Sequence, residues 1–320
     1  MTRLLYFSFF IGTTAFGQYE SDTSTFRIFL SPESCQTELD HDHVYEEEIN
    51  EKKGVRIITA NGIPAHKTGD FPNQGNPNTI KPQKANYEIP LNPEPADELI
   101  SAMGIRMGIL FSGVELDPFT GEFFRGSGGT NREWNITTLT STVDLGLDCN
   151  NGHVQPNGKY HYHGTPNAYL DEMEVDGSEM VKDGYAADGY PIYYKWGYNE
   201  SGDIVAYESG YRLKEGDRPG DGKSAPDGEY DGTYFQDYQY VDGVSELDAC
   251  NGRYGKTPES DNEYYYVITD NFPSSPICFK AEPSDDFKNG PMNGGPMDGA
   301  HRGGPGQLEP RAESRGGNRG

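Results

Sequence analysis

The scarcity of apolar residues at helical spacing is the feature that most restricts the fold of this chain. The best helical run lies between Glu98 and Leu110, and Gly104 and Gly108 interrupt it. Tyrosine occurs 22 times, phenylalanine 15 times and glycine 41 times. Aromatic residues favour strands, and glycine favours turns. We therefore predict an all-β, sandwich-like single domain of short antiparallel strands joined by long loops.

Composition divides the chain into four segments. Residues 1–17 combine a basic start with a short apolar run that ends in small residues, which is typical of a cleaved secretory signal peptide. Residues 18–53 are polar and acidic, and we expect a solvated lead-in. Residues 54–281 contain the strand and turn patterns and form the predicted domain. Residues 282–320 are rich in glycine and proline, so this tail is predicted to be disordered.

The formal net charge of −25 argues against two classes of partner. An acidic surface repels nucleic acid and anionic lipid, so we predict no nucleic-acid binding. The apolar run of the signal peptide is too short to span a bilayer comfortably, and no other segment is suited to do so, so we predict no transmembrane segment. The protein is therefore predicted to be secreted, whether extracellular, periplasmic or on the cell surface. A small molecule or a glycan is the expected kind of ligand.

The chain has four cysteines, Cys35, Cys149, Cys250 and Cys278. In an exported protein an even number predicts two disulfides, and four cysteines allow three pairings. No C-x-x-C spacing occurs, so the pattern does not support a zinc ribbon or a thioredoxin-like motif. Cys250 and Cys278 flank a tyrosine-rich strand, which favours a bond between them and leaves Cys35 with Cys149 by elimination.

Two histidines alternate with two tyrosines in the segment Tyr160-His-Tyr-His163. Residues two apart in a strand point to the same face, so His161 and His163 are predicted on one face and the tyrosines on the other. Their backbones would lie about 6 to 7 Å apart. Both imidazoles can therefore reach one metal ion.

Two further histidines are candidates for the same site. His153 is joined to the pair by Val-Gln-Pro-Asn-Gly, a turn that can fold its strand back beside them. His66 ends a turn that begins at Asn61-Gly62 and lies in the predicted domain. Neutral imidazoles on a rigid sheet suit zinc or copper. The alternative is a half-buried strand whose histidines bond to backbone or tyrosine.

One carboxylate is a candidate for catalysis. Asp188 precedes Gly189 in a tyrosine-rich stretch, and it could orient a ligand histidine or act as a general base beside a metal-bound water. The alternative is that this Asp-Gly pair is a hairpin turn.

A short sequence repeat occurs in two parts of the chain. Leu147-Asp-Cys-Asn-Asn-Gly-His153 recurs as Leu247-Asp-Ala-Cys-Asn-Gly-Arg253, and each copy precedes an aromatic strand. We interpret the pair as one unit used twice, with the tyrosines as scaffold and the histidines as an addition to the first copy. The alternative is convergent turn chemistry.

The histidine segment and its surroundings resemble the YHYH-domain family, which is named for this tetrapeptide. The resemblance covers about residues 54–280. It rests on Gly152–Gly164, Asn61–His66, Asp188–Tyr193, Leu247–Arg253 and Tyr264–Thr269, in the family's order. The resemblance implies an exported protein, and it implies no reaction, because the family has no assigned biochemical function.

Two functions are compatible with these patterns. The first is an exported metal-binding protein that holds zinc or copper, where zinc would support hydrolysis and copper would support oxidation with tyrosines as redox partners. The second is a non-catalytic surface, adhesion or glycan-binding module with exposed tyrosines and structural histidines.

Overall fold

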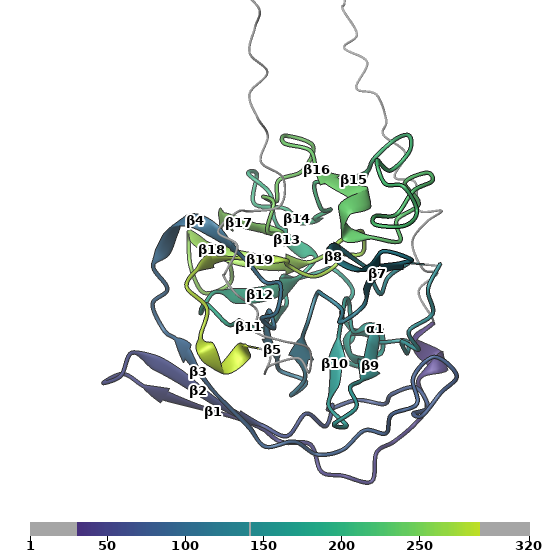
Figure 1. Cartoon of the computed structure of the whole chain (residues 1–320). Helices are drawn as coiled ribbons and strands as arrows, with labels where there is room; N and C mark the ends of the chain where they lie inside the picture. Colours follow the sequence, from purple (N-terminus) through teal and green to yellow (C-terminus); the bar gives the residue numbers. More distant parts are fainter. Residues whose placement is uncertain (1–30, 141, 289–320) are drawn as a thin grey trace, which may run out of the picture.

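The computed structural model describes residues 31–140 and 142–288. The predicted signal peptide and most of the predicted disordered tail lie outside the described residues. Strands dominate the described chain, which confirms the prediction of a β-rich, sandwich-like domain (Figure 1). The helices in this part of the chain are too short to span a bilayer.

The largest sheet has eight strands. In spatial order they are β17 (Gly252–Gly255), β18 (Glu263–Ile268), β12 (Pro191–Tyr194), β11 (Lys182–Ala186), β5 (Gly108–Leu110), β6 (Glu115–Leu116), β10 (Tyr160–Tyr162) and β9 (Gly152–Val154). Two of its pairings, β10 with β6 and β12 with β18, are parallel. The prediction of antiparallel strands did not include these two pairings.

Smaller sheets and short helices surround the large sheet (Figure 1). A three-stranded sheet contains β1 (Tyr45–Asn50), β2 (Val55–Ala60) and β3 (Ala85–Pro90). The two-stranded sheets pair β4 (Pro95–Ser101) with β19 (Cys278–Ala281), β7 (Phe123–Gly126) with β8 (Gly129–Asn135), β13 (Trp196–Tyr198) with β14 (Ile204–Ala206), and β15 (Tyr211–Leu213) with β16 (Tyr238–Tyr240). The helices are α1 (Asn167–Glu172) and the 3₁₀ turns η2 (Pro32–Ser34), η3 (Phe235–Asp237) and η4 (Asp285–Phe287).

The large sheet consists of two equivalent halves. Strands β9, β10, β6 and β5 form one half, and β17, β18, β12 and β11 repeat the same order from the opposite edge. In each half the outer pair is antiparallel, the next pair is parallel and the inner pair is antiparallel. The halves meet where Ile109 of β5 lies opposite Tyr185 of β11. The repeat recognised in two turns therefore extends over four strands.

Glycine is required at the centre of this arrangement. A Cβ atom on Gly108 would collide with the backbone of Tyr185, and a Cβ atom on Gly184 would collide with the backbone of Ile109. Each half therefore needs a glycine at the same position, because the two backbones pack directly against each other.

The two Leu-Asp segments fold into the same turn. In each copy, one oxygen of the aspartate accepts hydrogen bonds from two backbone N–H groups of the turn. The other oxygen accepts a hydrogen bond from the first tyrosine of the next strand, at 2.8 Å in both copies, from Tyr160 to Asp148 and from Tyr264 to Asp248. The aspartates therefore serve to join each turn to its tyrosine strand.

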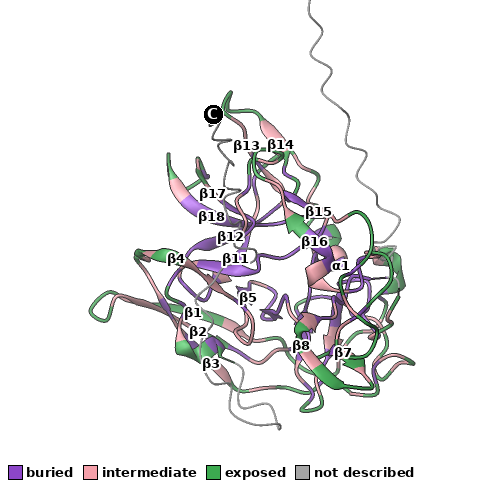
Figure 2. Cartoon of the chain, turned by 45° about the horizontal axis from the view of Figure 1, so that its top comes forward, coloured by how far each residue is buried: buried purple, intermediate pink, exposed green. Residues whose placement is uncertain are grey.

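The main hydrophobic core lies on the tyrosine face of the large sheet. It contains Tyr160 and Tyr162 of the first half and Tyr264 and Tyr266 of the second. Figure 2 shows that β11, β12 and β18 at the centre are largely buried. Buried phenols need hydrogen-bond partners, and the fold supplies them within the core. Most of the sheet's tyrosines are therefore core residues.

Both disulfides have the predicted pairing. Cys35 bonds to Cys149 with a Cα–Cα distance of 5.9 Å, and Cys250 bonds to Cys278 with a Cα–Cα distance of 4.9 Å. The first ties the segment before β1 to the first Leu-Asp turn, and the second ties the second Leu-Asp turn to β19. The two bonds are consistent with an oxidising, non-cytoplasmic compartment.

The described domain extends beyond the predicted limits of 54–281. Strand β1 lies within the acidic lead-in, where Glu47 forms an ion pair with Arg56 of β2 and the other glutamates of the strand face solvent. At the other end, η4 follows the predicted limit and buries Phe287 completely against the core. Composition did not predict these two elements, because β1 is rich in glutamate and η4 contributes only one apolar side chain to the core.

Candidate metal centre

Three of the four predicted histidines come together on β9 and β10. His153 lies directly opposite His161 in the antiparallel pair, and His163 follows one residue after the end of β10. The three ring centroids are 4.7 to 4.8 Å apart. One nitrogen from each ring lies within 4.8 Å of the other two. Three ligand atoms at this spacing can surround one metal ion at bond lengths of about 2.0 to 2.1 Å after small ring movements.

A backbone carbonyl group sets the tautomer of His153. Its Nδ1 lies 2.9 Å from the carbonyl oxygen of Leu145, so Nδ1–H donates to that oxygen and the lone pair lies on Nε2. The Nε2 atoms of His153 and His163 are 3.1 Å apart. Histidine ligands of metals usually donate their other N–H group in this way. His153 therefore presents its Nε2 atom to His163.

The site favours neutral imidazoles. His161 and His163 are 3% and 2% exposed, and the Nδ1 atom of each has no hydrogen-bond partner among residues 31–140 and 142–288. Burial is the main cause that lowers the pKa of both rings well below the ordinary value, and the neighbouring imidazoles lower it further. A backbone hydrogen bond at Lys159 for His161, and at Asp117 for His163, opposes this lowering of the pKa. A protonated cluster is disfavoured, and neutral imidazole is the form that binds metals.

The structure does not bring His66 into this cluster. Its Nε2 atom bonds to the phenol of Tyr162, and its Nδ1 atom bonds to the carbonyl oxygen of Lys67 at 2.7 Å. Tyr162 points away from the face that carries His161 and His163, so His66 lies on the opposite side of β10. The predicted site of four histidines is therefore corrected to three, because both nitrogens of His66 are engaged elsewhere in the fold.

Asp188 also lies away from the histidines. It occupies the turn between β11 and β12, and β11, β5 and β6 separate β12 from β10 in the sheet. One oxygen of its carboxylate accepts hydrogen bonds from the phenol of Tyr266 at 2.6 Å and from the backbone N–H groups of Lys280 and Ala281 at 3.1 Å. Ser112 holds Tyr162 in the same way in the first half, at 2.9 Å. The predicted catalytic role of Asp188 is therefore replaced by a structural one.

Sequence reasoning missed a carboxylate beside the histidines. Strand β6 pairs in parallel with β10, with Glu115 beside His161, and a backbone hydrogen bond of 2.8 Å from Asp117 N to Tyr162 O continues the register. Asp117 therefore lies beside His163, and its side chain is 5% exposed. Burial raises the pKa of Asp117 to about 7, and the charge of Arg106 opposes that rise. Only the fold could reveal this neighbour, since 46 positions separate the residues along the chain.

Glu115 belongs to a buried ion network next to the same histidines. Its carboxylate contacts Arg106 Nε at 2.6 Å and Lys159 Nζ at 2.9 Å, and it accepts a hydrogen bond from Tyr87 at 2.5 Å. Two cations share this one carboxylate. Breaking a buried ion pair by removing one partner is costly, so the network holds β6 and β10 in a fixed register.

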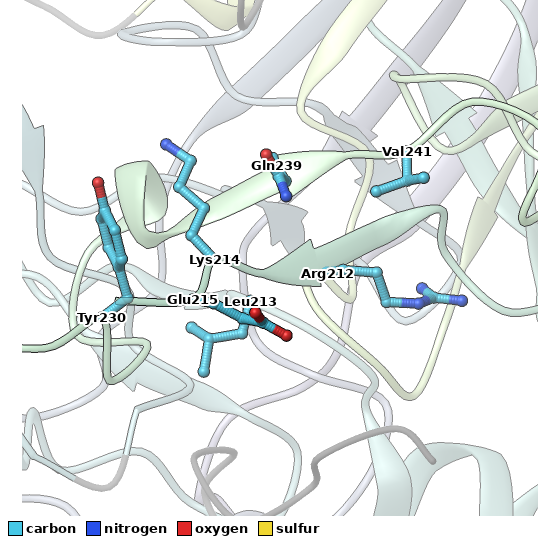
Figure 3. A pocket seen from close by; sticks show the side chains of 7 residues that line it. All are labelled: Arg212, Leu213, Lys214, Glu215, Tyr230, Gln239 and Val241. Atoms are coloured by element: carbon cyan, nitrogen blue, oxygen red, sulfur yellow. The ribbon is translucent and has the colours of Figure 1, made fainter. Parts of the chain in front are cut away.

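A surface pocket lies far along the chain from the histidines. A groove of about 470 Å³ is lined by Arg212, Leu213, Lys214, Glu215, Tyr230, Gln239 and Val241 (Figure 3). Lys214 donates a hydrogen bond to Gln236 O at 2.7 Å, and Arg212 donates to two backbone carbonyl groups. The two cations therefore already hold backbone groups of their own region, and none of the three histidines lines the groove.

A β-rich domain with two disulfides and a three-histidine cluster is the class of protein that this fold and this site define. Comparison with known families matches residues 86–281 to the family described as YHYH protein. The match covers more than half of the chain, so the chain belongs to the YHYH family, as the resemblance of its motifs predicted. No curated protein and no solved structure shows significant similarity to it.

Proposed function

We propose that the protein is an exported metal-binding protein whose centre is formed by His153, His161 and His163 with zinc or copper. The observation that carries the proposal is the convergence of three imidazoles in which, among the described residues, the buried Nδ1 atoms of His161 and His163 have no hydrogen-bond partner. Buried polar atoms are almost always hydrogen-bonded, so unpartnered ones call for an explanation. A bound metal ion would supply a partner for an unpartnered imidazole nitrogen.

The ligand set supports these two metals above others. Imidazole suits zinc and copper, whereas magnesium and calcium prefer oxygen ligands. Three protein ligands leave one position of a four-coordinate ion open, which is the arrangement of catalytic zinc sites. Hydrolysis with zinc or oxidation with copper are the reactions that such a position supports.

The burial of the tyrosines favours this proposal over a glycan-binding or adhesion module. That alternative requires tyrosines on the surface. Among the described residues, the tyrosine with a largely exposed ring is Tyr254, at 51%. The tyrosines of β10 and β18 fill the core instead.

Metal analysis tests the proposal. Protein exported by its own host is purified without chelators, and its zinc and copper contents are measured by mass spectrometry. About one equivalent is expected in the wild type, and none in the variant with both His161→Ala and His163→Ala. His41→Ala is the matched control, because His41 is exposed and outside the cluster. Folded, metal-free wild-type protein that binds neither added ion would refute the proposal.

A further inference from the structure

The two halves of the large sheet provide an internal comparison for each residue of the metal centre. Scaffold positions carry the same residue in both halves: Asp148 and Asp248, Asn151 and Asn251, Gly152 and Gly252, Tyr160 and Tyr264, Tyr162 and Tyr266, Thr165 and Thr269. These residues make the turns, the close contacts and the core that both copies need. Positions that differ in chemistry are those that the repeated fold does not dictate.

The three histidines occupy such positions. Their equivalents in the second half are Arg253, Tyr265 and Val267, of which Tyr265 and Val267 belong to a hydrophobic cluster. The backbone of that half forms the same strands without histidine. The fold therefore does not require imidazoles at these places.

Asp117 changes together with the histidines. Leu116 lies beside Tyr162 in the first half as Ile192 lies beside Tyr266 in the second, so the equivalent of Asp117 is Tyr193. Tyr193 is fully buried and packs in the same hydrophobic cluster. The repeated fold thus accepts an aromatic side chain at this position, whereas burying a carboxylate there has an energetic cost.

The charges of Arg106 and Lys159 and a backbone hydrogen bond from Phe119 offset part of that cost, and burial still raises the pKa of Asp117 to about 7. The positive charge of Arg106 acts on Asp117, but the guanidinium Nε of Arg106 contacts Glu115 at 2.6 Å. Within the described residues, the potential ligand atoms that lie within 4.8 Å of one another belong to the three histidines and do not include the Asp117 carboxylate. The backbone register therefore places Asp117 beside His163, and its carboxylate is not one of the three clustered ligand groups.

We propose that Asp117 is a positioning residue of the metal centre, whose carboxylate accepts a hydrogen bond from a water or hydroxide ligand in the open coordination position and balances part of the charge of the ion. This inference rests on the proposed function. It assigns to the centre a small oxygen ligand, held between the metal and β6. It also explains why a carboxylate is buried where the second half has tyrosine.

The test compares metal affinity with the stability of the metal-free protein. Zinc dissociation constants are measured by competition with a chromophoric chelator for the wild type, Asp117→Asn and Asp117→Glu. Loss of an outer partner of a metal site weakens binding by about 10- to 100-fold. We expect a loss of this size in Asp117→Asn, and partial recovery in Asp117→Glu. The visible spectrum of the cobalt(II)-loaded protein is expected to change in Asp117→Asn, because the oxygen ligand is held differently.

Asp183→Asn is the matched control. Asp183 is another fully buried carboxyl group, and both of its oxygens lack a hydrogen-bond partner within the described residues. Its charge acts on Tyr162, on the opposite face of β10. Both substitutions should raise the thermal midpoint of the metal-free protein, because each removes a buried ionisable group. Only Asp117→Asn should weaken zinc binding.

The outcomes separate this inference from the proposed function. A wild type that binds no metal contradicts the proposed function itself. A wild type that binds zinc with the same affinity as Asp117→Asn overturns the role of Asp117 and leaves the histidine centre intact. A lower midpoint of metal-free Asp117→Asn would identify a structural role and would also overturn the inference. Should Asp117→Asn fail to fold, Asp117→Ser gives the same comparison.

Discussion

Replacing Asp183 with asparagine is expected to stabilise the protein at alkaline pH. The side chain is fully buried, and neither carboxylate oxygen has a hydrogen-bond partner in the described part of the chain. Burial raises its pKa from 3.8 to about 7. At 1.36 kcal/mol per pH unit, this rise corresponds to at most roughly 4 kcal/mol of unfolding free energy.

The direction follows from proton binding. A carboxyl group whose pKa is raised by folding binds more protons in the folded state than in the unfolded state. The contribution of Asp183 to the unfolding free energy is therefore complete below about pH 4 and is lost as pH rises to about 7. Asparagine keeps the shape and has no charge to bury. We therefore expect the gain in Asp183→Asn to be small at pH 4.5 and to reach about 1 to 4 kcal/mol at pH 8.

Urea unfolding followed by intrinsic fluorescence measures this difference. Wild type and variant are unfolded at pH 4.5, 6 and 8, and the two free energies are subtracted at each pH, so that titrating groups common to both proteins cancel. A difference that does not grow between pH 4.5 and pH 8 would refute the reasoning, because it would mean that Asp183 finds a partner or a water when it ionises.

Three further predictions follow from the same contacts. Burial lowers the pKa of His66 from 6.5 to about 4, so the contribution of the neutral ring to the unfolding free energy is present above pH 6.5 and is lost as pH falls. The unfolding free energy should therefore drop by about 2 kcal/mol between pH 6.5 and pH 5. Urea titrations of His66→Gln should lack this drop. Tyr160→Phe and Tyr264→Phe should each lower the unfolding free energy by about 1 to 2 kcal/mol, because each removes one hydrogen bond to an aspartate oxygen; Asp148 keeps the backbone N–H of Gly69 as a donor and Asp248 is half-buried, and an unchanged denaturation midpoint in both variants would contradict the prediction. Reduction of the disulfides should lower the thermal midpoint, and replacing the one that spans 114 residues by serines should cost more than replacing the one that spans 28, about 5 against about 3.5 kcal/mol.

Local pattern was sufficient for the part of the site that lies on one hairpin. Residues two apart in a strand share a face, which predicted that His161 and His163 act together, and the short turn before them predicted that His153 folds alongside. The disulfide pairing was predicted because Cys250 and Cys278 lie on either side of one tyrosine-rich strand. These features depend on neighbours in sequence or on elimination among few alternatives.

The errors concern contacts between distant segments. His66 was grouped with the other histidines, but the loop that carries it reaches the opposite face of β10. There the Nε2 atom of His66 forms a hydrogen bond with the phenol of Tyr162. Asp188 was assigned to catalysis, and only the equivalence of the two halves shows that it replaces Ser112 as the partner of a core tyrosine. Asp117 was overlooked because a parallel pairing places it beside His163, and no local pattern indicates such a pairing.

Anomalous X-ray scattering tests the metal centre most directly. Crystals of protein exported by its own host are measured above and below the zinc and copper absorption edges. The account predicts one anomalous peak at about 2.0 to 2.1 Å from a nitrogen of each of His153, His161 and His163. A peak located elsewhere, or imidazoles that bond to one another with no peak between them in protein that was given both metals, would contradict it.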